Sequence, residues 1–232
     1  LKRDDRKRRS ADLDRSCVLA LGQLCGPWDD DKSPDAELSK LLWEVRAKNR
    51  DKQTGYFATI ALGQIGGKQN RERLVDGLRR GKALEQPWFA IALGVMTHAQ
   101  YTAQTNAGRD LEIDEDVAAA LADQWRDGSE PSFTGALGIA YGLCRCTDMA
   151  PKLRERLVKE PHKEAQAGYL ALGLALMNDR AAIETLRNVL PLATRRPDLL
   201  KQAAVALGLL GDAACSQPAQ GDCDAPRRAA AR

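Results

Sequence analysis

"FATIALGQIGG", residues 57–67, is the stretch that decides the fold of this 232-residue chain. It contains the triplet Ala-Leu-Gly at positions 61–63, and the same triplet occurs five more times. The six triplets end at Gly22, Gly63, Gly94, Gly138, Gly173 and Gly208, with spacings of 41, 31, 44, 35 and 35 residues. These spacings are typical of repeats built from helix pairs. The recurrence therefore predicts an architecture rather than a single glycine-rich binding loop.

The segments that carry the triplets are apolar nearly all round, as in residues 135–144, and such helices must be covered on several sides. Small Ala and Gly side chains let neighbouring helices approach closely while Leu fills the core. Glycine inside a helix costs roughly 1 kcal/mol relative to alanine, so its recurrence indicates that close packing offsets the loss. Gly66 and Gly67 are expected to end their helix and turn the chain.

Between the triplet segments lie helices of a different, amphipathic character. The clearest has Leu38, Leu41, Leu42 and Val45 at helical spacing. We expect Ser33 to cap its N-terminus and Pro34 to lie in its first turn, and its solvent-exposed side carries a Glu44–Lys48 pair. The other amphipathic segments are expected at residues 71–80, 114–125, 151–158 and 179–190. First-turn prolines are predicted for four triplet helices, at Pro87, Pro131, Pro161 and Pro197.

The strings "VLALGQLCG", "TIALGQIGG", "YLALGLALMND" and "AVALGLLGD" resemble the HEAT-repeat superfamily, most closely the short bacterial HEAT-like repeats of the phycobilisome-lyase type. The resemblance covers residues 11–212. It implies an all-α, right-handed α-solenoid of about five HEAT-like helix pairs after a leading partial repeat. We therefore predict a HEAT-like repeat domain over residues 1–212 and a tail, cap or linker over residues 213–232.

Charge and hydropathy exclude some classes of partner. The formal net charge is +3, from 35 basic and 32 acidic residues, and the triplet helices have no Arg/Lys stripe, so nucleic acid is not the expected partner. No apolar run reaches the ~18 residues of a membrane span. The basic start "LKRDDRKRRS" has no signal-peptide core and no methionine, and looks like a cut edge of a longer protein. The compartment is left open, with the cytoplasm slightly favoured and export still possible.

Three enzyme types built on HEAT-like repeats are weighed against the residues present. A di-iron hydroxylase needs several His-Glu motifs, but the chain has only His98 and His162, and neither precedes Glu. A DNA glycosylase has aromatic candidates, Trp88, Trp125, Tyr141 and Tyr169, but lacks the basic surface. A tetrapyrrole lyase is supported by the repeat type alone. No catalytic residue, cofactor site or metal site is therefore predicted.

Two acidic or cysteine-bearing segments remain as weaker candidates. Asp29, Asp30 and Asp31 are adjacent carboxylates, but they lack the alternating spacing of a calcium loop, and a solvated turn with Trp28 against the first repeat is preferred. Cys215 and Cys223 could form a disulfide if the protein is exported.

The function predicted from the sequence is a non-catalytic module that binds another protein, as a scaffold or adaptor within a larger chain. The alternative is a HEAT-like enzyme or ligand-binding protein acting on nucleic acid or a tetrapyrrole. The candidate partner-binding residues fall into two groups. Aromatic residues near the starts of triplet helices are Tyr56, Trp88, Phe133 and Tyr169, and the expected long loop at residues 97–114 adds His98, Tyr101 and Arg109.

Overall fold

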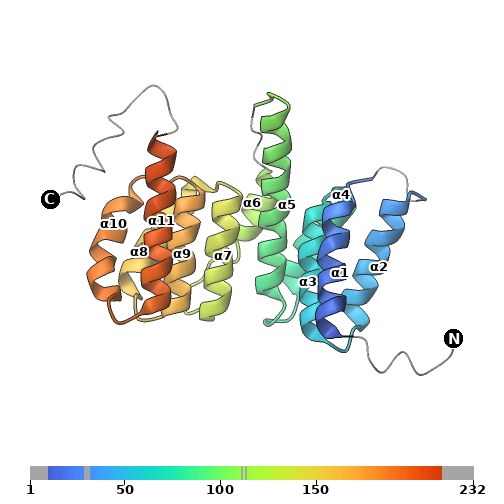
Figure 1. Cartoon of the computed structure of the whole chain (residues 1–232), viewed down its shortest axis with the longest axis horizontal. Coiled ribbons are helices and arrows are strands. Elements are labelled where there is room, and N and C mark those ends of the chain that lie inside the picture. Colours follow the sequence, from blue (N-terminus) through green and yellow to red (C-terminus); the bar gives the residue numbers. More distant parts are fainter. Residues whose placement is uncertain (1–9, 29–31, 111, 113, 216–232) are drawn as a thin grey trace. The chain divides into compact units, whose positions relative to one another are not determined.

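A computed structural model of the chain describes residues 10–28, 32–110, 112 and 114–215, the last four without their side chains (Figure 1). Within these residues the regular elements are all helical, as the sequence predicts, and no strand occurs. The α-helices are α1 (Ala11–Leu24), α2 (Pro34–Lys48), α3 (Lys52–Ile65), α4 (Lys68–Arg80), α5 (Gln86–Asn106), α6 (Glu115–Ala122), α7 (Pro131–Leu143), α8 (Ala150–Lys159), α9 (Glu164–Leu176), α10 (Ala182–Val189) and α11 (Pro197–Cys215). Two 3-10 helices, η2 (Thr147–Met149) and η3 (Leu190–Ala193), adjoin α8 and α10.

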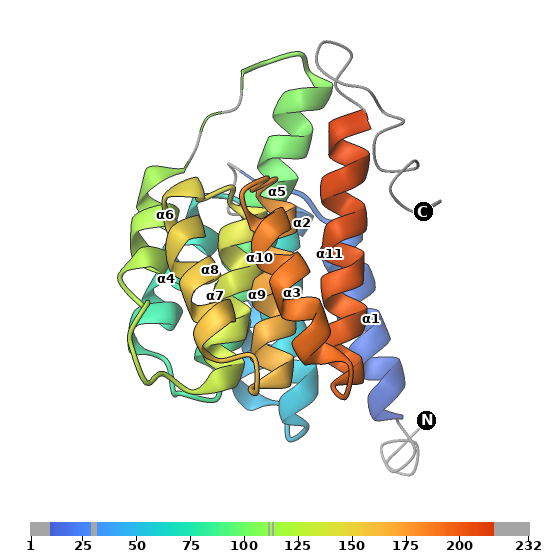
Figure 2. The same cartoon turned by 90° about the vertical axis from the view of Figure 1, so that its left-hand side faces the viewer.

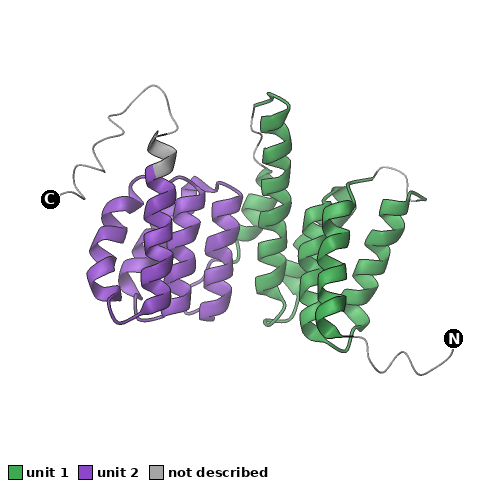
Figure 3. Ribbon diagram, in the orientation of Figure 1, with its two compact units in different colours: residues 1–124 green, residues 125–232 purple. Residues whose placement is uncertain are grey.

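The chain divides into two compact units, residues 1–124 and residues 125–232 (Figure 3). In the first unit α3 packs between α1 and α5, α2 packs on α3, and α4 packs on α5 and α6. In the second unit α9 packs between α7 and α11, and α8 and α10 lie next to each other against this row (Figure 2). Each unit therefore has a row of triplet helices covered by the other helices. The single repeat domain over residues 1–212 stays a prediction, and α11 extends past its expected end to Cys215.

The six triplets all lie within helices, and several of their glycines are points of close approach. A Cβ on Gly22 of α1 would lie 2.7 Å from the Cα of Ala61 in α3. A Cβ on Gly63 of α3 would lie 2.9 Å from the carbonyl carbon of Ala92 in α5, and closer still to its oxygen. Backbone atoms cannot move aside as a flexible side chain can, so these positions require glycine. The predicted role of the triplet as a packing joint is confirmed at these helix crossings.

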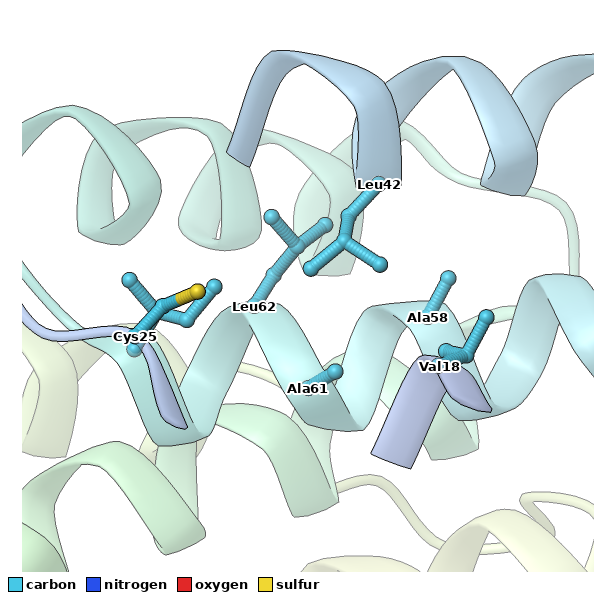
Figure 4. Close-up of a cluster of buried hydrophobic side chains, with 7 residues drawn as sticks. Val18, Cys25, Leu42, Ala58, Ala61 and Leu62 are labelled. Carbon is cyan, nitrogen blue, oxygen red and sulfur yellow. The ribbon is translucent and has the colours of Figure 1, made fainter. Parts of the chain in front are cut away.

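A buried hydrophobic cluster of the first unit includes Leu62, the leucine of the triplet at 61–63 (Figure 4). Leu42 of α2 points toward Leu62, and both side chains are fully buried. Val18 of α1 and Cys25, which follows the last residue of α1, also belong to the cluster, and Trp28 packs against it while remaining partly exposed. The triplet thus combines small residues at the crossing with a leucine directed into the core.

Most of the expected helix signals are confirmed. The Ser33 hydroxyl accepts a hydrogen bond from the backbone N–H of Ala36 at 3.2 Å, with Pro34 in the first turn of α2. Lys48 Nζ lies 3.2 Å from Glu44 Oε2. Gly66 and Gly67 end α3 and turn the chain, with φ of 71° and 85°. Pro87, Pro131 and Pro197 occupy first turns of triplet helices.

Two expectations about helix boundaries are wrong. Pro161 lies in the turn before α9, which begins only at Glu164, because a capping turn separates it from α8. The segment expected as a loop from Thr97 continues α5 as far as Asn106. Its Thr, Ala and Gln residues tolerate helix, and the hydroxyls of Thr97 and Thr102 bond to the carbonyls of Leu93 and His98. The first residue that requires left-handed backbone is Gly108, with φ of 64°.

Among the helices in the described part of the chain, none combines the length and the apolar character that crossing a membrane requires.

Candidate functional site

Two of the four predicted aromatic anchors stack on each other and are only partly exposed to solvent. Tyr56 of α3 and Trp88 of α5 stack with ring centroids 5.0 Å apart and an interplanar angle of 8°. Phe57 meets the Trp88 ring edge-on at 6.3 Å. All three side chains are half-buried. The three rings pack α3 against α5, so this cluster stabilises the packing of helices within the first unit.

Tyr169 of α9 is the one predicted aromatic anchor that is exposed, with 41% of its surface accessible. Its ring lies over Gly135 of α7, where a Cβ would be 2.9 Å from Tyr169 Cδ2. Leu176, 38% exposed, lies in the same way over Gly142, where a Cβ would be 2.8 Å from Leu176 Cβ. Phe133, near the start of α7, is half-buried.

Tyr169 and Leu176 belong to a continuous apolar stripe on α9. Ala165, Tyr169, Leu172 and Leu176 follow one another at helical spacings of four, three and four residues, and we call these four residues the α9 stripe. Ala165 is exposed and Leu172 half-buried. The glycines of α7 bring α9 close, so the two larger side chains lie on the surface of a closely packed helix pair.

The second group of predicted residues is divided by the extension of α5. His98 is exposed on α5 and Arg109 is exposed beyond its end. Tyr101 is only 3% exposed, so the expectation that it projects toward a partner is wrong. The reason is that residues 97–106 are helical, which turns Tyr101 onto the buried face of α5 while His98 stays on the wet face.

Arg109 lines a surface hollow of the first unit with a volume of about 650 Å³. The opposite wall holds Arg71 of α4, whose guanidinium bonds to Asp114 at 2.9 and 3.1 Å and to Asp116 at 2.7 Å. Burial lowers the pKa of Arg71, but the two carboxylates outweigh this and raise it. Asp114 also caps α6 by accepting a hydrogen bond from the Val117 N–H. The charges of Arg71, Asp114 and Asp116 are therefore engaged in holding the start of α6 against α4.

A second hollow, of about 540 Å³, lies between α2 and α4 and is lined by residues that the sequence analysis did not single out. The Arg46 guanidinium sits 4.5 Å from the centroid of Phe89 and bonds to Glu85 at 2.6 Å. Arg73 lies over the Trp43 ring at 5.4 Å. Only the i,i+3 spacing of Trp43 and Arg46 within one helix was visible in the sequence. The pairing with Arg73 and Phe89 depends on how α2, α4 and α5 pack.

The described residues form no metal site, and the structure does not test the predicted disulfide. Among the described residues, no three His, Cys, Asp or Glu side chains converge so that they could hold a metal ion. Asp29, Asp30 and Asp31 lie outside the described residues. The same holds for Cys223 and for the side chain of Cys215, so their pairing stays a hypothesis.

No family model matches the chain, and neither a curated protein nor a solved structure is significantly similar to it. The class of protein defined by the fold is thus an all-helical chain whose recurring triplet helices pack in rows. The HEAT-like resemblance stays a prediction.

Proposed function

We propose that this chain is a non-catalytic module that binds another protein through the α9 stripe, as a scaffold or adaptor. We also propose that its helices form a right-handed HEAT-like α-solenoid of about five helix pairs. The observation that carries the functional proposal is the exposure of Tyr169 beside Leu176 on a helix held by neighbours on several sides.

The chemistry of the stripe favours an apolar partner segment. None of its four side chains is charged, and its only polar group is the Tyr169 hydroxyl. Contiguous exposed apolar residues are typical of interaction sites. Tyrosine offers a large contact area with few rotatable bonds, so it loses little entropy on binding. Because α9 packs against α7, α8 and α11, the surface is formed before the partner arrives, which lowers the cost of binding.

The test measures binding of a partner captured by the full chain, using Tyr169→Ser and Leu176→Ser. We expect each variant to weaken binding by ~10-fold or more, as is common for a central aromatic or aliphatic anchor. Val158→Ser is the matched control, since Val158 is 57% exposed on α8, away from the stripe. Equal binding by all four proteins would contradict the proposal.

The alternative ligand classes are tested with the same proteins. Duplex and single-stranded DNA are titrated by fluorescence anisotropy, and a linear tetrapyrrole by its absorbance. The proposal expects no saturable binding of either. If DNA or the tetrapyrrole binds saturably and Tyr169→Ser abolishes that binding, the proposal is wrong and the chain acts on that class of ligand.

A further inference from the structure

The last triplet helix of the second unit, α11, has an uncovered side that matches a packing face elsewhere in the chain. In α3 the triplet alanine Ala61 meets α1 and the triplet glycine Gly63 meets α5. In α11 the corresponding Ala206 is fully buried, but a Cβ on Gly208 would meet nothing within 4 Å. As in α3, the alanine and the glycine of the triplet in α11 face different sides of the helix. In α11, however, no neighbouring residue among those described contacts the side that carries the glycine.

The open side of α11 consists of Lys201, Val205, Gly208 and Leu209, which we call the tail face. All four residues are exposed, with Val205 at 48% and Leu209 at 44%. Counted from the triplet glycine, Val205 occupies the position of Ile60 in α3, and Gly208 that of Gly63. The tail face therefore repeats the triplet glycine with which α3 meets α5, and a β-branched residue three positions before it.

The first triplet helix, α1, exposes the complementary set. Leu13, Cys17, Ala20 and Leu24 lie along one side of α1 and are all exposed, Leu13 by 55% and Leu24 by 83%. We call them the head face. The residues 41 positions later, in the register set by Gly22 and Gly63, are Thr54, Ala58, Ala61 and Ile65 of α3. Each of these is at most 1% exposed. The head face of α1 thus corresponds to a side of α3 that is buried, whereas in α1 this side is exposed.

We infer that the tail face of one copy binds the head face of a second copy of this chain. Gly208 then meets Ala20 as Gly22 meets Ala61 and Gly63 meets Ala92. The contact continues a packing rule already present between α1 and α3 and between α3 and α5.

The ion pair at the α1–α3 crossing has a basic counterpart on the tail face. Arg15 lies seven residues before Gly22 and bonds across the α1–α3 crossing to Asp51 at 2.9 Å. Lys201 lies seven residues before Gly208, so it takes the place of Arg15 in the contact between copies. The residue of α1 that corresponds to Asp51, 41 positions earlier, is Ser10, so the ion pair itself is not repeated. The side chain of Asp12, two residues further on, is 86% exposed.

Residues 1–9 and 216–232 are poorly suited to cover these faces. Residues 216–232 contain no Leu, Ile, Val, Met or aromatic residue, and residues 1–9 contain a single leucine. Neither segment has the apolar residues of a triplet helix. A second copy supplies a complete one.

Because the two faces differ, the contact is heterologous and leaves one head and one tail free in a pair of copies. Association therefore proceeds beyond the dimer, toward a chain of copies or a closed ring. This behaviour does not rest on the proposed function, since the α9 stripe is not part of either face.

The test uses Ala20→Arg, which blocks the head, and Gly208→Arg, which blocks the tail. Both positions are exposed, so each variant is expected to keep the helical circular dichroism of the original chain. In sedimentation velocity the original chain should grow in mass beyond a dimer as concentration rises. Each variant alone should remain monomeric. An equimolar mixture should form a dimer and nothing larger, because one free tail meets one free head. Val158→Arg, the control, should associate like the original chain.

Several results would overturn the inference. A monomeric original chain at all concentrations would show that the faces are covered by other means or do not bind. Association of either variant by itself would indicate a symmetric interface elsewhere. A mixture that stays monomeric, with both variants folded, would exclude the pairing of these two faces.

Discussion

At the scale of single residues, aromatic side chains in similar positions have different roles. Tyr56, Trp88 and Tyr169 all lie near the starts of triplet helices, and the sequence predicts each as a surface anchor. In the structure Tyr56 and Trp88 stack on each other, while Tyr169 keeps 41% of its surface exposed. The sequence could identify the positions, because they depend on spacing along the chain. It could not show which rings meet, because this depends on the register between neighbouring helices.

Replacing Trp88 with Leu should lower the free energy of unfolding by ~1–3 kcal/mol, since the stacked ring and part of its buried area are lost. The matched substitution Tyr169→Leu should change it by no more than ~0.5 kcal/mol, because that ring is largely at the surface. Urea unfolding followed by circular dichroism measures both. Equal losses would show that Tyr169 is also a packing residue.

At the scale of elements, local signals predicted several helix starts correctly, whereas the contacts between helices have no local signal in the sequence. Ser33 and Pro34 were predicted at the start of α2 because a cap is a local pattern. Asp51 also caps α3, accepting from the backbone N–H of Gln53 and Thr54, and it reaches Arg15 of α1. The second contact spans 36 residues and has no local signature.

The same limit explains the extent of α5. The sequence placed a loop at residues 97–114 because the triplet spacing is longest there. The extra residues instead lengthen the helix, since neither proline nor glycine interrupts it before Gly108. Tyr101 was consequently assigned to the surface although α5 buries it.

Asp51 should make stability depend on pH. Hydrogen bonds from Arg15 and then from Thr54 hold the pKa of its carboxyl well below the ordinary value. A carboxyl with a lowered folded-state pKa stabilises the fold above its unfolded pKa of about 3.9, and this contribution is lost as the pH falls toward the folded value. Asp51→Asn should therefore lower the thermal midpoint at neutral pH and approach the original chain in acid.

The control for this titration is Ser33→Ala, which removes a cap without an ionisable group. It should cost ~1 kcal/mol at neutral and acid pH alike. A difference between Asp51→Asn and the original chain that stays constant from neutral to acid pH would contradict the role of the ionised carboxylate.

At the scale of the whole molecule, the same rule holds in both units in that triplet glycines lie at close helix crossings. Triplet glycines admit a neighbouring backbone in the first unit at Gly22 and Gly63. In the second unit a Cβ on Gly173 of α9 would come 2.6 Å from the carbonyl carbon of Gly138 in α7. The packing role of the triplet could be predicted from its recurrence alone, because six copies of one string in a single chain do not arise by chance. The open glycine of α11 could not, because the six triplets look alike in sequence while only the structure shows which neighbour is missing.

The most direct test of the triplet as a packing joint compares Gly63→Ala with Gly208→Ala. Unfolding is measured for the unit that carries each substitution, at protein concentrations too low for association. Gly63→Ala should lower the free energy of unfolding by ~1–3 kcal/mol or more, because its Cβ would meet the backbone of Ala92. Gly208→Ala should raise it by ~0.5–1 kcal/mol, because alanine suits a helix better and nothing lies in its way. A stabilising effect at both positions would contradict the role of the triplet glycine as a joint.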